Sequence, residues 1–223
     1  MNLKLVFRVI AFLLLIVAAL MLTPAIVAWY YGEMHLLRHF LIPIGVLAIA
    51  ASAFLILTRS EQSVLSTRDG FFLVAASWLL VSLFGAIPLY TSGAIPRFVD
   101  AFFETMSGFT TTGASILTDI ESLPRSMLFW RSLTHWLGGM GIIVLTVAIF
   151  PILGIGGLQL LKAEAPGPTV DKITPKVTET AKILWLTYFG LTAAETLLLL
   201  IGGMDLFDSL THTFGTLATG GFS

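Results

Sequence analysis

The nine residues Ser107 to Ser115, SGFTTTGAS, form a short polar segment in a chain that is otherwise strongly apolar. They follow the apolar segment FVDAFFETM, and they hold three consecutive threonines and two glycines. Glycine permits positive φ and close approach of the backbone, while threonine favours an extended conformation and adds a hydroxyl oxygen. The segment is therefore predicted to end a short helix and to continue as non-helical backbone.

The composition indicates a membrane protein. Of the 223 residues, 57% are hydrophobic and only 11% are charged, with a mean hydropathy of +0.94. A soluble domain carries about 25% charged residues, so these charges are too few to cover the surface of a soluble globule. The net charge of −1 argues against nucleic acid as a partner, and the absence of cysteine excludes disulfides and thiolate metal sites.

Five segments approach the about 20 apolar residues that a membrane-spanning helix needs, which predicts an all-α membrane protein. They are residues 9–30, 40–57, 71–90, 133–153 and 183–201. The first is interpreted as a span and not as a cleaved leader, because its apolar run continues without a small-residue cleavage pattern. Eight lysines and arginines fall on the side of the N-terminus, against four (Arg38, Arg97, Arg125 and Arg131) on the other side. This bias predicts a multi-pass protein with a cytoplasmic N-terminus.

The long outer connection, residues 91–132, contains a segment of about twelve apolar residues, FVDAFFETMSGF. It is too short to cross the bilayer, so we expect a re-entrant half-helix that enters from outside. Asp100 is predicted as its N-cap, with Asp208 in the same role further along the chain. The threonine and glycine residues that follow are predicted to end the helix.

The sequence also contains an internal repeat. A shift of 108 residues places FVDAFFETMSGFTTTGAS (98–115) on LFDSLTHTFGTLATGGFS (206–223). The identical positions pair Asp100 with Asp208, Thr105 with Thr213, Thr111 with Thr219, Gly113 with Gly221 and Ser115 with Ser223. The repeating unit is a span, a half-helix, a Thr/Gly loop and a second span, and the second copy stops inside its loop.

Non-helical backbone at membrane depth persists only where it packs in protein or lines a cavity. Strands of Thr and Gly arranged around an axis present carbonyl oxygens that can replace the hydration shell of a cation. A half-helix entering from outside also points its negative C-terminal end toward the centre of the membrane. The alternative, an external polar loop after an interfacial helix, is less favoured because two copies share one register.

Several segments resemble the TrkH branch of the Trk/Ktr/HKT potassium transporter superfamily. They are Phe103-Glu104 through SGFTTTGAS, then SLPRSMLFWRSLTHWLGGMGIIVLTVAIFPILGIGGLQLLKAEAPGP (122–168), and finally TLATGGFS (216–223). The resemblance implies a potassium-channel-like fold with four span–pore-loop–span repeats around one pore, preceded by two additional helices. Residues 1–67 would be the additional pair, 68–161 the first repeat, 162–174 a cytoplasmic linker and 175–223 a truncated second repeat. The chain would thus be a fragment with five transmembrane helices and two re-entrant half-helices.

The resemblance also implies which residues form the selectivity filter. They are Thr110, Thr111, Thr112, Gly113 and Ala114 in the first loop, and Ala218, Thr219, Gly220, Gly221 and Phe222 in the second, with potassium held at Thr111, Thr112, Thr219 and Gly220. Both loops depart from the TVGYG type, so looser selectivity is expected, with rubidium tolerated. The implied function is potassium uptake across the cell inner membrane, without catalytic residues or a cofactor. The implied partners are a second copy of the chain and a cytosolic, nucleotide-binding TrkA-like subunit.

Two other functions are compatible with parts of the sequence. An alternating-access cation carrier also uses broken helices, although two loops opening on one side argue against inverted repeats. An intramembrane enzyme would pair Ser115 with His135 or His212, but the sequence has no G-x-S-x-G motif. His135 is more simply a structural residue near the outer interface. Glu195, in the middle of the last span, is either functional or satisfied by the neighbouring Thr192.

Overall fold

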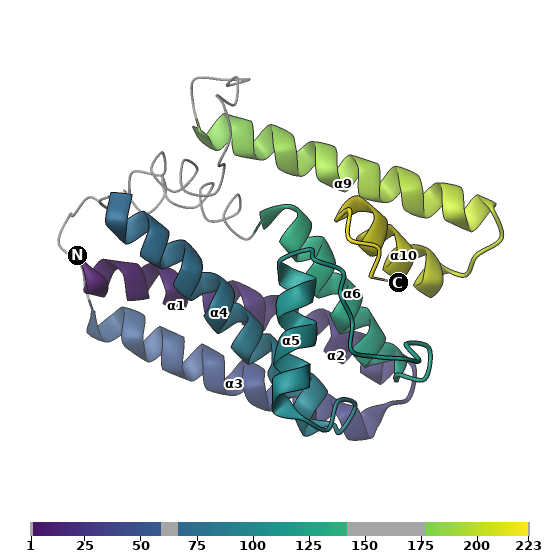
Figure 1. The fold of residues 1–223 in the computed structure, drawn as a ribbon, viewed down its shortest axis with the longest axis horizontal. Helices are drawn as coiled ribbons and strands as arrows, with labels where there is room; N and C mark the ends of the chain where they lie inside the picture. The colour runs from purple at the N-terminus through teal and green to yellow at the C-terminus, as the bar shows by residue number, and fades with distance from the viewer. Residues whose placement is uncertain (1, 59–66, 142–176, 223) are drawn as a thin grey trace.

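The computed structural model describes residues 2–58, 67–141 and 177–222, and the regular structure within them is helical (Figure 1). The helices are α1 (Leu3–Leu20), α2 (Leu22–Tyr30), α3 (Met34–Leu57), α4 (Thr67–Thr91), α5 (Phe98–Phe109), α6 (Arg125–Gly139), α9 (Val177–Ile201) and α10 (Leu206–Leu217). Segments long and apolar enough to cross a membrane are Leu3–Tyr30, Met34–Leu57, Arg68–Thr91 and Lys182–Ile201. They confirm an all-helical membrane protein. The predicted span at 133–153 begins inside α6, and most of it lies outside the described residues.

The first span is not one continuous helix, because α1 ends at Leu20 and α2 begins at Leu22. Pro24 has no N–H with which to bond the carbonyl of Leu20, four residues earlier. The hydroxyl of Thr23 donates to that carbonyl instead, at 2.8 Å. A hydroxyl from the same chain thus satisfies the carbonyl that proline leaves free, as membrane helices require.

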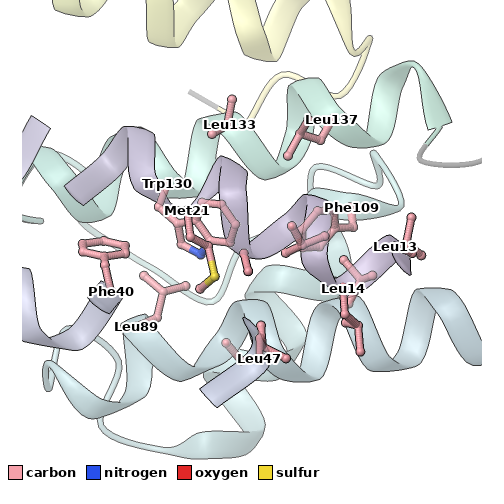
Figure 2. Close-up of a cluster of buried hydrophobic side chains, with 14 of the residues drawn as sticks. Leu13, Leu14, Met21, Phe40, Leu47, Leu89, Phe109, Trp130, Leu133 and Leu137 are labelled. Atoms are coloured by element: carbon pink, nitrogen blue, oxygen red, sulfur yellow. The ribbon is translucent and has the colours of Figure 1, made fainter. Parts of the chain in front are cut away.

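Helices α5 and α6 lie between two groups of helices (Figure 1). On one side α4 packs against α5 and α2 packs against α6, and on the other side α10 packs against both α6 and α9. Figure 2 shows the apolar cluster where the N-terminal helices meet this central pair, including Met21, Phe109 and Trp130. Lipid is as apolar as these side chains, so close packing and hydrogen bonds hold the helices together. The indole of Trp130 illustrates this, since its Nε1 donates to the carbonyl of Gly85 at 2.9 Å.

The helix ends fall on two faces of the protein. On the N-terminal face, the backbone N–H of Asn2 donates to Asp69 at 3.0 Å, which places the start of α1 beside the start of α4. On the opposite face, the start of α6 meets Glu33 and comes within 3.9 Å of Asp205, the residue that precedes α10. Helices α5 and α10 therefore both begin on the face where α4 and α9 end.

Candidate functional site

The two half-helices have the same length and the same register. Helices α5 and α10 have 12 residues each, and the bounds of one become those of the other after the 108-residue shift. At 1.5 Å per residue, each is about 18 Å long, well short of the about 30 Å of a bilayer core. Each is therefore too short to cross a bilayer, and its last carbonyls have no partners within the helix.

The predicted N-caps of these helices are wrong. The residue at the N-cap of α5 is Arg97, and Asp100 lies inside the first turn, with its carboxylate 3.6 Å from Arg97 Nε. In α10 the N-cap is Asp205, whose side chain accepts from the N–H of Asp208 at 2.8 Å. An acidic residue in the first turn is stabilised by the helix dipole just as an acidic cap is, so the sequence signal does not separate the two positions.

Both half-helices end in the same backbone motif, in which a residue in the left-handed region closes the helix. The motif has two backbone hydrogen bonds, and both recur in the second copy. In the first copy, Thr111 N–H donates to Gly108 O and Thr112 N–H to Ser107 O, each at 3.0 Å. In the second copy, Thr219 N–H donates to Thr216 O at 2.8 Å and Gly220 N–H to Gly215 O at 3.3 Å. The φ of Thr111 is 55° and that of Thr219 is 58°. In the described part of the chain, these two are the only residues other than glycine at positive φ. Such a conformation in a β-branched residue is an outlier that costs about 1–3 kcal/mol and is typical of functional sites.

The two loops touch each other at their glycines. A Cβ on Gly113, which has a φ of +73°, would lie 2.0 Å from the carbonyl oxygen of Gly220. A Cβ on Gly220 would lie 3.0 Å from the carbonyl oxygen of Thr111 and 1.8 Å from Nε2 of His135. Only glycine fits at either position. Two loops about 108 residues apart in the sequence thus pack backbone against backbone.

The other predicted site residues divide by exposure. Thr110, Thr112, Ala114, Thr219 and Gly221 are exposed, whereas Ala218 and Phe222 are buried. The hydroxyl of Thr110 donates to the carbonyl of Met106 at 2.7 Å and lies 2.8 Å from that of Thr112. The first loop is therefore stabilised by side-chain hydrogen bonds that the second, with alanine and glycine at the matching positions, cannot make.

Sequence reasoning missed a buried ion pair behind the loops. Arg131 Nε donates to Glu104 Oε1 at 2.6 Å, and the side chains of Arg131 and Glu104 are 1% and 0% exposed. Glu104 also accepts from the hydroxyl of Ser115 at 2.8 Å and from the N–H of Ile116 at 3.0 Å. Arg131 also donates through Nη1 to the carbonyl of Phe222, and its guanidinium lies 3.5 Å from the centroid of the Phe222 ring. The pair therefore contacts the segment that leaves the first loop and the end of the second loop.

A signal for this pair existed in the sequence. FFETM places Glu104 in an apolar segment, and FWRSLTHW does the same with Arg131 and His135; ionisable residues within a membrane are functional candidates. The count of outer positive charges treated Arg131 as a loop residue. That assignment is wrong, because Arg131 lies inside α6 and is buried.

Helix α6 supports both loops through residues with little or no side-chain volume. A Cβ on Gly138 would lie 2.2 Å from the carbonyl oxygen of Phe109, and one on Gly139 would lie 2.6 Å from the hydroxyl of Tyr188. These glycines therefore permit close packing of α6 against α5 and α9. His135 is fully buried, with its ring centroid 4.7 Å from that of Phe222, so it packs against the end of the second loop.

Two further interpretations of polar residues can be compared with the structure. The hydroxyl of Ser115 donates to Glu104, so it is not directed at His135 as a nucleophile–base pair requires. The hydroxyl of Thr192 donates to the carbonyl of Tyr188 at 2.7 Å and not to the carboxylate of Glu195, which is one of the two alternatives for that residue. Glu195 is half-buried in α9, and its role stays open.

A cavity of about 570 Å³ opens on the face where the half-helices begin. It lies between α10 and the segment from Thr118 to Arg125, and three acidic residues, Asp119, Glu121 and Asp208, contribute to its lining. Acidic groups in a hollow of low-dielectric walls raise the local concentration of cations. Because Arg125 is the only lysine or arginine among the described residues of the lining, the cavity has an excess of acidic side chains on the face where α5 and α10 begin.

These features define a class of protein: a multi-pass helical membrane protein in which two helices too short to cross a bilayer end in paired non-helical loops. The chain matches the family described as "TrkH: Cation transport protein" over residues 39–223, and it belongs to this family.

Individual relatives agree with this assignment. The Trk system potassium uptake protein TrkH of Escherichia coli is 43% identical, and that of Halomonas elongata is 41% identical, each over all of this chain and 46% of the relative. The crystal structure of the potassium transporter TrkH from Vibrio parahaemolyticus matches with a TM-score of 0.80 and 37% identity, over all of this chain and 44% of that one. The chain thus spans about half the length of the curated relatives it matches.

Proposed function

We propose that this chain contributes the first part of the pore of a potassium-uptake transporter. Residues 110–114 and 218–222 would be two of its selectivity-filter segments, with potassium bound at Thr111, Thr112, Thr219 and Gly220. One observation carries the proposal: two loops of equal register adopt the same strained backbone, and each packs a glycine directly against a main-chain oxygen of the other. The names of the relatives, potassium uptake proteins, support potassium as the transported ion.

The physical basis is the replacement of water by carbonyl oxygens. A potassium ion entering this region loses hydration, and main-chain oxygens of the two loops, such as those of Thr111 and Gly220, would compensate for that loss. The C-terminal ends of α5 and α10 both point at the loops, and their partial negative charges favour a cation. Two loops cannot surround an ion, so we infer that further segments complete the ring, which agrees with relatives of about twice the length.

The same proposal includes an orientation. With the N-terminus in the cytoplasm, the face on which α5 and α10 begin is external, and potassium enters through the acidic cavity. A membrane potential of 100 mV supplies about 2.3 kcal/mol per monovalent ion for this movement. From the family we also infer that the protein lies in the cell inner membrane, forms a homodimer and binds a TrkA-like cytosolic subunit. The same inference divides the chain after residues 67, 161 and 174.

The competing functions fit these observations less well. An alternating-access carrier with inverted repeats would place its two broken helices on opposite faces, whereas α5 and α10 begin on the same face. The family description, a cation transport protein, disfavours an intramembrane enzyme. A channel-like pore is therefore the function that the geometry supports best.

The test is Gly113→Ser in the full reading frame that contains this chain, expressed in cells without their own potassium uptake. A side chain at Gly113 meets the Gly220 carbonyl, so we expect potassium-over-sodium selectivity to fall about tenfold or more, corresponding to about 1.4 kcal/mol. Gly93→Ser is the matched control, because Gly93 has a φ of +79° and nothing within 4 Å of its would-be Cβ. Unchanged selectivity of Gly113→Ser, at a normal level in the membrane, would refute the filter assignment.

A further inference from the structure

The buried ion pair between Glu104 and Arg131 is more elaborate than a contact that only joins two helices. Its carboxylate receives Arg131 Nε, the Ser115 hydroxyl and the Ile116 N–H, all within 3.0 Å. Its guanidinium donates to the carbonyl of Phe222 and lies against the ring of the same residue. Each partner therefore contacts a different loop segment, and the short bond between them connects the two.

We propose that Glu104 and Arg131 are positioning residues that fix the two loops relative to each other, and so set the ion selectivity of the pore. This inference rests on the proposed function. Moving either loop along the pore axis would break a bond to one member of the pair. The distance between the main-chain oxygens of the loops is thus controlled from behind, by groups that do not touch the ion.

The energetics of burial favour such a role over a purely structural one. Removing two charges from water is expensive, and a buried ion pair is often no more stabilising than apolar residues of similar volume. Its value lies in the geometry that it imposes, because unsatisfied charges in an apolar interior strongly disfavour other arrangements. Fully buried charges with several directed hydrogen bonds therefore restrict the position of the nearby backbone more than apolar packing does.

Arginine is suited to this task in a way that lysine is not. Its planar guanidinium can donate along its edge to Glu104 and to the Phe222 carbonyl while its face stacks on the Phe222 ring. An ammonium group has no face to stack and no fixed fork of donors. Because the Phe222 carbonyl accepts from Arg131, we assign Phe222 as an anchor of the second loop and not as an ion ligand.

The pair is also not a duplicated feature of the repeat. In the 108-residue register, the second copy has His212 at the position of Glu104. One anchor in the first repeat therefore serves both loops. This explains why Arg131 of α6 reaches Phe222 across 91 positions of sequence.

The decisive variant is Arg131→Lys in the full reading frame, which keeps the charge and removes the planar fork. We expect the potassium-over-sodium permeability ratio to fall about threefold or more, as expected for the loss of one or two directed hydrogen bonds, with the amount of protein in the membrane retained. The control is Arg38→Lys. Arg38 is also a helical arginine, in α3, but it is exposed, and its Nε donates to Nε2 of the neighbouring His39 at 3.2 Å.

Two milder variants keep the test informative if Arg131→Lys does not accumulate in the membrane. Ser115→Ala removes one hydrogen bond to Glu104, and Phe222→Leu removes the stacking on Arg131, while both leave the charges paired. Each is expected to lower the same permeability ratio. A structural role alone predicts less protein in the membrane with an unchanged ratio per molecule.

The outcomes separate this inference from the proposed function. If Gly113→Ser lowers selectivity while Arg131→Lys, Ser115→Ala and Phe222→Leu keep the wild-type ratio, the positioning role is wrong and the filter assignment stands. If Gly113→Ser also leaves the ratio unchanged, the filter assignment itself is refuted. A lowered ratio in the three anchor variants, with Arg38→Lys unchanged, supports the positioning role.

Discussion

Replacing Thr111 by glycine should stabilise the protein while impairing its selectivity. Thr111 has a φ of 55° at the position that closes α5, where glycine is the usual residue. A β-branched residue in this region costs about 1–3 kcal/mol, and glycine removes that strain. The greater flexibility of glycine in the unfolded chain costs about 0.5–1 kcal/mol. The net expectation is a gain of about 1 kcal/mol in the free energy of unfolding.

The neighbouring Thr110 provides a control in which the same substitution has the opposite effect. Its φ of −84° is ordinary, and its hydroxyl donates to the carbonyl of Met106 at 2.7 Å. Thr110→Gly therefore relieves no strain, loses a hydrogen bond of about 1 kcal/mol and adds the entropy of glycine. It should destabilise the protein by about 1–2 kcal/mol, so the two variants should differ by about 2–3 kcal/mol.

Both variants should be measured by equilibrium unfolding of the full reading frame in detergent micelles, with tryptophan fluorescence as the signal, and by potassium and sodium uptake. We expect Thr111→Gly to unfold at a higher denaturant concentration than the wild type. We also expect it to discriminate less between potassium and sodium, because its loop is no longer held in one conformation. Equal destabilisation by Thr111→Gly and Thr110→Gly would refute the argument that the backbone at Thr111 is strained. Unchanged discrimination would show that this strain does not serve selectivity.

Two other predictions concern the support of the loops. The carboxylate of Glu33 accepts from the N–H groups of Arg125 and Ser126 at 2.8 and 3.0 Å, so Glu33→Gln should destabilise the start of α6 by about 1 kcal/mol, measured by the same unfolding assay. An equal loss from Glu121→Gln, an exposed glutamate, would contradict a capping role. Gly138→Ala places a methyl group 2.2 Å from a backbone oxygen of α5 and should destabilise by about 1–3 kcal/mol. Gly45→Ala, with nothing within 4 Å, should be tolerated, and equal effects of the two alanines would refute the packing argument.

The sequence was most informative where physical requirements leave few residue choices. Apolar runs of sufficient length located the spans in the described residues, because a bilayer requires such runs for crossing helices. The half-helix at Phe98–Phe109 followed from a run too short to cross. The repeat then located its counterpart at Leu206–Leu217, with identical bounds after the shift. Helix starts were predicted several residues late, because helices extend past the apolar core into polar residues.

The support of the loops could not be derived in the same way, because it depends on contacts between distant residues. Nothing local in the sequence indicates that Glu33 caps α6, 92 positions away, since the contact exists only after α2 packs against α6. Glu104 and Arg131 could each be noticed as charges in apolar segments, but not as partners. Three-dimensional packing decides which of several charges meet, and a single sequence does not contain that information.

The two loops are more alike in backbone conformation than in side chains, and this favours main-chain oxygens over side-chain hydroxyls as the ion ligands. Thr110 and Thr112 of the first loop correspond to Ala218 and Gly220 of the second, so two of the hydroxyls have no counterpart. The left-handed residues nevertheless recur at Thr111 and Thr219 and at Gly113 and Gly221, together with the hydrogen bonds that close the helices. If the threonine hydroxyls were the ligands, the second loop would lack part of the site. If main-chain oxygens are the ligands, both loops supply equivalent ligand groups. The side chains can then differ between the loops, because they only anchor each loop to the rest of the protein.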